Sequence, residues 1–475
     1  MYRGRTLVGT VVLVREALLW YDRHVNVTVH PGTLSGAHPM PGSKSHTIRA
    51  LLVAALAHGE SRISGALDSA DTAACIRILR ELGVEIRVEG ADGGTAASSG
   101  PAAGLTLRVT GRAGDFSPPE GPLDCANSGT TLYLALSATA LQAFPVTLTG
   151  DEQLQHRSAG PLLAALESMG ARVERRGTGD CVPLTVTGPM EGGRVSIECP
   201  TSQYLSSLLL AAPLTAQGME IDVPLLNERP YVELTLSWLD HQGIAYERDG
   251  WRRFRVRGGG AYRAFERRVP ADFSSATFFL AAAAVTGSRL ALTGLDMGDS
   301  QGDREVVRIL ERLGCAVETG DQLVTIAGPG SPAASGGSEP AAAARLAGGE
   351  VDLNAIPDSL PALAVVGTTC AEPLRLTNVP QAREKETDRI AVMARVIDDL
   401  GGRAEELPDG LVVHPGRLKG GTVDSAGDHR VAMAAAVAGL CADGPVTVTN
   451  AGVADITFPG FYDLLAAAGA RVEAS

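Results

Sequence analysis

The sequence predicts an α/β protein in which six related units are divided between two globular lobes. Two patterns carry this prediction, because each occurs six times along the 475 residues. In the first, a short amphipathic helix ends at a glycine turn and continues into a strand. In the second, an Ala- and Leu-rich helix is followed by a polar turn and a strand. Repeats of this length are too long for a solenoid of small units and suit two lobes of three units each.

The two helical patterns predict different positions in the fold. The amphipathic helices each present one apolar face to a core, and their turn glycines are Gly83, Gly170, Gly243, Gly314, Gly401 and Gly469. The Ala- and Leu-rich helices are apolar nearly all round, so each should be buried inside its lobe. With their following strands they span residues 49–63, 131–150, 204–222, 276–294, 362–378 and 432–450. Residues 90–104 and 327–350 are Gly-, Ala-, Ser- and Pro-rich and are expected to be loops.

The composition argues against several classes of function. The net charge of −13 disfavours a nucleic-acid or anionic-membrane binder, and no apolar run approaches the ~20 residues that span a bilayer. The seven cysteines contain no CxxC pair and are expected to be reduced thiols, which predicts a cytoplasmic protein. The nine histidines show no metal-ligand spacing, so no metal site is predicted.

Polar segments precede the six buried helices. They lie at residues 41–49, 127–131, 200–204, 271–276, 356–360 and 427–430. Each contains Ser, Thr, Asn or Asp, so helix capping alone explains any one of them. Six together favour a second role, because helix N-termini offer free N–H groups and a partial positive charge to anions. If several of these starts converge on one cleft, they form a site for phosphates and carboxylates.

A charged segment, REKETDR at residues 383–389, adds candidate site residues. It is compatible with a solvated helix face that carries i,i+4 ion pairs, as most charge runs are. Lys385 argues against a solvated helix face, because the chain has only three lysines among its 41 basic residues. Lysine can release a proton, whereas arginine stays protonated, so Lys44 and Lys385 are candidates for a chemical role.

Ten motifs in a fixed order are the most specific signal in the sequence. They are PGSKSHTIRALLVAAL, ANSGTT, TSQYLSSLLLAAP, RPYVELT, ADFSSATFFLAAAA, QGDREVVRILERLG, NAIPDSLPALA, KETDR, GDHRVAMA and TFPGFYDLL. Together they resemble the 5-enolpyruvylshikimate-3-phosphate synthase family over about residues 30 to 475. The resemblance implies an enolpyruvyl-transferase fold of six βαβαββ units, three per lobe, with inner helices aimed at an interlobe cleft. It implies one lobe from residues 43–270 and another from residues 25–42 and 271–475, preceded by an N-terminal extension, residues 1–24.

The resemblance also implies an activity. Members move the enolpyruvyl group of phosphoenolpyruvate to the 5-hydroxyl of shikimate 3-phosphate and release phosphate, a step toward chorismate and the aromatic amino acids. No metal or other cofactor is implied, and the protein is expected to be a monomer without nucleic-acid or membrane partners. Both substrates are polyanions, so the cleft must be locally basic despite the overall charge of −13.

By this resemblance, both lobes contribute substrate-binding residues. Shikimate 3-phosphate would be held by Lys44, Ser45, Arg49, Thr201, Ser202, Gln203, Asp358 and Lys385, with Thr201 and Ser202 on its phosphate. Phosphoenolpyruvate would be held by Lys44, Asn127, Gly129, Arg157, Gln203, Arg389 and Arg430. The implied catalytic residues are Lys44, Asp358 and Glu386, with Glu386 placed to protonate the methylene carbon. A carboxylate pair suits this chemistry if its surroundings push the two pKa values apart.

Four positions depart from the family pattern, and one of them is Ser158, where proline usually follows the arginine. Glu228 stands where a phosphate-binding serine is usual, Tyr133 where arginine is common, and Ile456 where many members have lysine. Glu228 either turns away and pairs with a neighbouring arginine, which leaves Thr201, Ser202 and Arg229 to hold the phosphate, or it faces the acceptor and selects one without a phosphate there. We favour the first arrangement, because the other phosphate-binding residues are retained.

The sequence is compatible to different degrees with three alternative functions. A UDP-N-acetylglucosamine enolpyruvyl transferase is disfavoured, because its Gly-Gly-Cys loop is absent. An enolpyruvyl transferase that acts on a different acceptor in specialised metabolism is motivated by Glu228. A non-catalytic ligand-binding homologue is disfavoured by the retained Lys44, Asp358 and Glu386.

Overall fold

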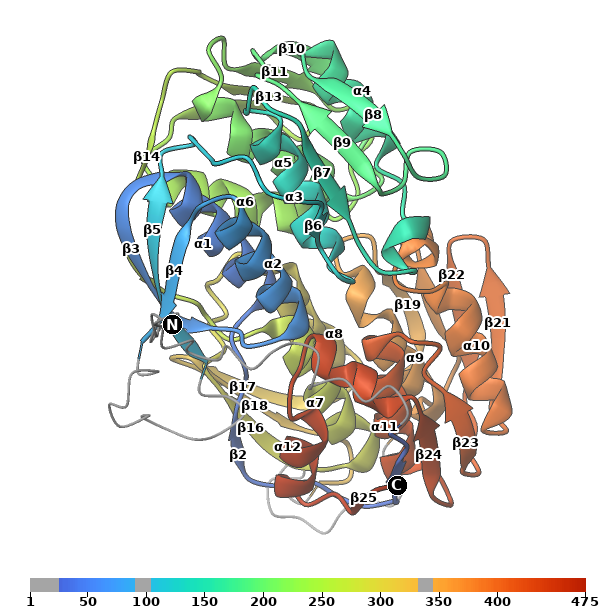
Figure 1. Cartoon of the computed structure of the whole chain (residues 1–475). Coiled ribbons are helices and arrows are strands. Elements are labelled where there is room, and N and C mark those ends of the chain that lie inside the picture. Colours follow the sequence, from blue (N-terminus) through green and yellow to red (C-terminus); the bar gives the residue numbers. More distant parts are fainter. Residues whose placement is uncertain (1–24, 90–103, 332–344) are drawn as a thin grey trace, which may run out of the picture.

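The computed structural model describes residues 25–89, 104–331 and 345–475. The predicted N-terminal extension and most of both predicted loops lie outside these ranges. Within them the chain forms six small sheets and twelve α-helices (Figure 1). The predicted α/β class with six units is therefore confirmed.

One helix of every unit is buried along almost its whole length. These inner helices are α1 (Lys44–Leu56), α3 (Gly129–Thr139), α5 (Ser202–Ala211), α7 (Phe273–Thr286), α9 (Leu360–Thr369) and α11 (His429–Cys441). Their small side chains let neighbours approach closely, so α7, α9 and α11 pack against one another, and α3 packs against α1 and α5. The predicted burial of the Ala- and Leu-rich helices is confirmed.

The second helix of every unit keeps a face toward solvent. These outer helices are α2 (Ala70–Glu81), α4 (Gly160–Ser168), α6 (Arg229–His241), α8 (Glu305–Arg312), α10 (Arg389–Asp399) and α12 (Phe461–Ala467). A predicted turn glycine follows each of them, and all six adopt a positive φ between 67° and 113°. Glycine enters this left-handed region without the steric penalty of a Cβ, which explains why the turns require it.

The six sheets share one topology, in which a parallel pair of strands is extended by two antiparallel strands. The first sheet of the first lobe contains, in spatial order, β14 (Tyr262–Arg263), β3 (Ala57–Ala66), β5 (Leu105–Arg112) and β4 (Glu85–Val88), and β15 (Glu266–Arg268) also pairs with β3. The second contains β6 (Leu123–Asp124), β7 (Val146–Thr149), β9 (Leu184–Thr187) and β8 (Arg172–Arg175). The third contains β10 (Gly193–Ser196), β11 (Met219–Asp222), β13 (Arg253–Val256) and β12 (Tyr246–Asp249).

The second lobe repeats this arrangement. Its first sheet contains, in spatial order, β2 (Ala37–Pro39), β16 (Arg289–Thr293), β18 (Leu323–Ala327) and β17 (Ala316–Gly320). Its second contains β19 (Gly349–Asp352), β20 (Leu374–Thr377), β22 (Gly410–His414) and β21 (Arg403–Leu407). Its third contains β23 (Gly421–Asp424), β24 (Val446–Thr449), β1 (Val27–Val29) and β25 (Val472–Ala474). Figure 1 shows β2, coloured blue, beside strands that lie some 250 residues later in the chain.

Two separate hydrophobic cores underlie the two lobes. One core contains buried residues from Ile48 to Val269, and the other contains buried residues from Val27 to Met40 and from Ala271 onward. The predicted lobe boundaries, at residues 42–43 and 270–271, fall between these cores. No helix in the described part of the chain is both long enough and apolar enough to cross a membrane.

The chain crosses between the lobes along two adjacent segments. Gly42 and Ala271 form an isolated antiparallel bridge, which holds the two crossings together. A Cβ on Gly42 would lie 2.0 Å from the carbonyl oxygen of Gly65, so only glycine fits this approach. The crossings place the starts of α1 and α7 next to each other at the junction of the lobes.

Candidate active site

Five of the six inner helices begin at one cavity, which residues of both lobes line. The contributions from the starts of α1, α3, α5 and α11, and from the turn before α9, are Lys44, Ser45, Gly129, Thr130, Gln203, Asp358, His429 and Arg430. Helix α7 does not line the cavity; its cap Asp272 accepts a hydrogen bond from the backbone N–H of Ser275 at 3.1 Å. The expected convergence of helix starts is therefore found for five of the six segments.

Eleven of the fourteen residues that the resemblance implicated line this cavity. They are Lys44, Ser45, Arg49, Gly129, Arg157, Gln203, Asp358, Lys385, Glu386, Arg389 and Arg430. The other three, Asn127, Thr201 and Ser202, do not line it. The Asn127 amide donates to Asp151 Oδ2 at 2.9 Å and to Gln153 Oε1 at 2.6 Å, so it supports the turn before α3.

Capping hydrogen bonds are present at the helix starts that line the cavity. Thr201 Oγ1 accepts from the N–H of Gln203 at 3.4 Å, and Asp428 Oδ1 accepts from the N–H of Arg430 at 2.8 Å. Each cap takes one of the N–H groups that a helix start leaves unbonded, and the positive end of the helix dipole remains directed at the cavity. Capping and a site for anions are thus not exclusive alternatives.

The REKETDR segment is not a solvated helix face. A 3₁₀ helix, Pro380–Glu384, ends before Lys385, whose backbone is extended, and α10 begins at Arg389 behind its cap Asp388. This break in the helix turns Lys385 and Glu386 toward the cavity instead of solvent. The interpretation as a regular surface helix with i,i+4 pairs is therefore wrong, because the segment is only partly helical and faces inward.

Arg389 is the centre of a buried ion-pair network. Its guanidinium is 1% exposed and bonds to three carboxylates: Asp358 at 2.7 Å, Asp428 at 2.7 Å and Glu386 at 2.5 Å. Arg430 bonds to the second oxygen of Asp358 at 2.8 Å. The bidentate geometry that guanidinium offers lets one side chain orient several carboxylates at once.

Ion pairs around the cavity lie both between the two lobes and within the first lobe. Arg157 of the first lobe lies 3.5 Å from Glu386 of the second. Lys44 pairs within the first lobe with Asp71 at 3.0 Å. These side chains leave a cavity volume of about 40 Å³. A ligand larger than this volume fits only if some of these side chains move.

Both candidate catalytic carboxylates are ionised in this arrangement. Burial raises the pKa of Asp358, but Arg430 and Arg389 outweigh it and lower that pKa overall. Burial also raises the pKa of Glu386, but Arg389 and Arg157 outweigh it and hold that pKa well below its usual range. The condition that the surroundings push the two pKa values apart is not met in this structure, because nearby cations lower both values and Arg389 acts on both groups.

Arg49 has a different environment from the other basic residues. Its Nε donates to Thr235 Oγ1 at 2.8 Å, and its terminal nitrogens donate to the carbonyl oxygens of Ser45 (3.1 Å) and Tyr231 (3.2 Å). Burial lowers the pKa of Arg49 to about 10. These three acceptors are all neutral groups. The positive charge of the Arg49 guanidinium is therefore available to an anion that enters the cavity.

Glu228 does not turn away from the site. Its Oε1 accepts from Lys385 Nζ at 2.5 Å, and its Oε2 accepts from Thr201 Oγ1 at 3.1 Å and from Ser202 Oγ at 3.0 Å. Arg229 is exposed, and its guanidinium lies 6.0 Å from the centre of the Trp251 ring. The favoured arrangement, with Glu228 paired to a neighbouring arginine, is therefore wrong: the helix start of α5 and Lys385 bind its carboxylate inside the site.

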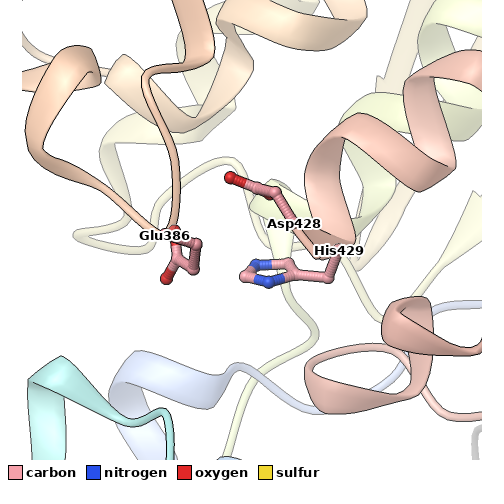
Figure 2. Close-up of side chains that lie close together, drawn as sticks. All are labelled: Glu386, Asp428 and His429. Atoms are coloured by element: carbon pink, nitrogen blue, oxygen red, sulfur yellow. The ribbon is translucent and has the colours of Figure 1, made fainter. Parts of the chain in front are cut away.

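Glu386, Asp428 and His429 form a compact group at the cavity (Figure 2). One potential ligand atom from each lies within 4.8 Å of the others, the arrangement of a possible metal site. Both carboxylates already bond to Arg389. Lys44 and Arg430 add further positive charge to the cavity, so this group is electrostatically unfavourable for a cation.

Four residues that line the cavity were given no role by the resemblance: Asp71, Thr130, Tyr231 and His429. Tyr231 donates to Asp303 Oδ2 across the lobes at 2.8 Å. Burial lowers the pKa of His429 well below its usual value, so its imidazole is neutral. His429 lies within the GDHR motif, which could have identified it; Asp71 carries no motif signal, since it meets Lys44 only through folding.

Two departures from the family pattern have structural explanations. Tyr133 donates to the carbonyl oxygen of Ser158 at 3.0 Å and meets the Tyr204 ring edge-on at 5.1 Å. It borders a second cavity of about 430 Å³, which shares Arg157, Lys385 and Glu386 with the first. Ile456 is 5% exposed and belongs to the core of the second lobe, so it does not reach the cavity.

Comparisons with known proteins agree with this arrangement. The family model described as EPSP synthase (3-phosphoshikimate 1-carboxyvinyltransferase) matches residues 29–465. A 3-phosphoshikimate 1-carboxyvinyltransferase of Acetivibrio thermocellus is 41% identical over 444 residues, which are 94% of this chain and 98% of the relative. One of Halobacterium salinarum is 39% identical over 461 residues, 94% of this chain and 100% of the relative.

A solved structure extends the comparison to the fold. The EPSP synthase from Acinetobacter baumannii superposes with a TM-score of 0.75 at 27% sequence identity, covering 95% of this chain and all of that one. The predicted two-lobed fold class is thereby confirmed. On the extent of the family match and the identity to its members, this chain belongs to the EPSP synthase family.

Proposed function

We propose that this chain transfers the enolpyruvyl group of phosphoenolpyruvate to the 5-hydroxyl of shikimate 3-phosphate and releases inorganic phosphate. The observation that carries this proposal is the convergence of five helix starts and six lysine and arginine side chains on one cavity that both lobes line. Such a cavity brings two polyanions together, because fixed cations and N–H groups offset their mutual repulsion. Membership of the family supports the choice of reaction.

The basic residues divide between the two substrates in this proposal. Arg157, Arg389 and Arg430 bind phosphoenolpyruvate and stabilise the departing phosphate. Lys44 lies between the two substrates, where one point charge serves both. Since Arg157 and Arg389 are paired with Glu386 in this structure, the substrate takes over cations that a carboxylate holds beforehand.

The reaction requires one proton to reach carbon and another to leave oxygen. As the acceptor oxygen bonds to C2 of phosphoenolpyruvate, the hydroxyl loses its proton and the methylene carbon C3 gains one. In the second step C3 loses a proton, the double bond forms again and phosphate leaves C2. We assign the proton on C3 to Glu386, with Asp358 and Lys385 beside the reacting hydroxyl. Asp358 is held in place for this by Arg389 and Arg430.

Formation of the ternary complex is expected to raise the pKa of Glu386. In this structure cations hold that pKa well below its usual range; bound substrates add negative charge and compete for Arg157 and Arg389, which favours the protonated form. The complex should therefore take up about one proton more than the Glu386→Gln complex does. Calorimetry with shikimate 3-phosphate and phospholactate, in buffers of different ionisation enthalpy, measures this. Equal proton uptake by the two proteins would contradict the assignment.

The activity itself is tested by phosphate release. We expect release from phosphoenolpyruvate only when shikimate 3-phosphate is present, and we expect the same rate with EDTA. Unphosphorylated shikimate is the matched control for the acceptor. Release with shikimate and none with shikimate 3-phosphate would show that the proposed acceptor is wrong.

A further inference from the structure

The start of α5 is an anion site that a side chain of the same chain occupies. Glu228 Oε2 accepts from Thr201 Oγ1 at 3.1 Å, from the backbone N–H of Ser202 at 3.2 Å and from Ser202 Oγ at 3.0 Å. The ten-residue helix directs its positive end at the same carboxylate. Three donors around one oxygen are the arrangement that helix starts offer to a phosphate.

A cation from the opposite lobe completes this site. Lys385 Nζ lies 2.5 Å from Glu228 Oε1, and the two side chains are 11% and 2% exposed. The lysine and the three α5 donors therefore all serve one buried carboxylate. Such charge-assisted hydrogen bonds are about twice as strong as neutral ones, so Glu228 is firmly bound.

The backbone conformation of residue 228 does not favour glutamate. Glu228 has φ 56° and ψ 39°, in the left-handed region that Asn and Gly enter far more readily than Glu. Asn378, directly after β20, and Asn450, directly after β24, have φ values of 56° and 53°. At these two left-handed positions of the second lobe the chain thus carries a residue that suits the backbone, whereas Glu228 contributes a carboxylate to the site.

The donors that bind Glu228 are also those that the resemblance assigns to the acceptor. Thr201 and Ser202 were expected on the phosphate of shikimate 3-phosphate, with Lys385 on the same molecule. A carboxylate and a phosphate cannot share these donors, because two anions at about 4 Å repel each other strongly in a buried site. One of them must leave when the other binds.

We propose that Glu228 is a specificity-determining residue that competes with the acceptor's phosphate for this anion site. The proposal rests on the proposed function. Shikimate 3-phosphate binds only when the Glu228 carboxylate gives up Thr201, Ser202 and Lys385, and its affinity is lower by the free energy of that exchange. Removing the charge of Glu228 leaves the site open to the phosphate.

The test compares two uncharged variants with the unaltered protein. Glu228→Asn suits the left-handed backbone, as at Asn378 and Asn450, and Glu228→Gln keeps the size of the side chain. We expect both to lower KM and Kd for shikimate 3-phosphate about tenfold or more, with a much smaller change in KM for phosphoenolpyruvate. Glu228→Asp keeps the charge and is expected to gain far less.

Glu233→Gln is the matched control. Glu233 lies on the same helix, α6, and pairs with Arg248 at 2.6 Å on the outer surface. Its replacement should leave KM for shikimate 3-phosphate unchanged. If Glu228 only joined the lobes, its uncharged variants would lose thermal stability and would bind shikimate 3-phosphate no better. Unchanged or raised KM and Kd in both variants would overturn the proposal.

The outcomes also separate this proposal from the proposed function. If the unaltered protein uses shikimate 3-phosphate and neither variant improves, the competition is refuted and the function stands. If the unaltered protein does not use shikimate 3-phosphate but Glu228→Asn does, the competition is supported. In that case Glu228 excludes the phosphate entirely, and the native acceptor lacks a phosphate at this position.

Discussion

Replacing Arg389 with Gln is expected to destabilise the protein by about 3 kcal/mol or more and to remove turnover. Arg389 is 1% exposed and neutralises Asp358, Asp428 and Glu386. Asp358 would keep its ion pair with Arg430 and Glu386 its ion pair with Arg157. Asp428, which is fully buried, would lose its ion pair with Arg389, and the neutral amide of glutamine cannot compensate its charge. Uncompensated buried charge is among the most destabilising changes a protein can undergo.

Urea unfolding, with phosphate release on the same samples, measures both effects. Arg395→Gln is the control, because Arg395 lies on the same helix and is exposed; it should shift neither the unfolding midpoint nor the rate. Arg389→Lys should recover part of the stability, since it restores the charge without the planar guanidinium. An unfolding midpoint of Arg389→Gln equal to that of the unaltered protein would refute a stabilising role for the network.

Replacing Glu386 with Gln is expected to lower kcat about a hundredfold or more, with little change in KM for either substrate. The variant keeps the size of the side chain and its ability to accept from Arg389, but it cannot deliver a proton to carbon. A loss confined to kcat indicates an interaction made in the transition state. Asp358→Ala is expected to lower kcat similarly, because Asp358 lies beside the reacting hydroxyl in the proposed mechanism.

Initial rates of phosphate release over a range of both substrates provide kcat and KM separately. Glu384→Gln is the control, because Glu384 belongs to the same segment and is exposed; its rate should match that of the unaltered protein. Near-normal turnover of Glu386→Gln would mean that Glu386 serves only to pair Arg157 and Arg389.

The repeating elements could be predicted because their signals are local. The Ala-rich stretch that became α7 shows its burial in its own composition, and the glycine that ends each outer helix, such as Gly314 with φ 112°, shows its turn. Helical periodicity and the steric freedom of glycine depend on a few consecutive residues. The motif resemblance added most of the cavity, including Lys44, Arg157 and Arg389.

The electrostatics of the site could not be predicted in the same way. The predicted acid–base roles of Asp358 and Glu386 require different pKa values, yet Arg389 contacts both carboxylates and lowers the pKa of each. Asp71 has no motif, although it is the ion-pair partner of Lys44. A pKa depends on burial and on every charge within a few ångströms, and neither quantity exists until the lobes have assembled.

The six units, the buried helices and the polar residues at the helix starts are all predicted from the amino-acid sequence alone. The motif resemblance assigned residues 25–42, and with them β1 and β2, to the second lobe, whereas only the tertiary structure revealed what Glu228 binds. Glu228 and Lys385 are 157 residues apart and meet because the two lobes come together. Local elements follow from the propensity and periodicity of neighbouring residues. The partners of a charged side chain depend on long-range packing, which no local sequence pattern encodes.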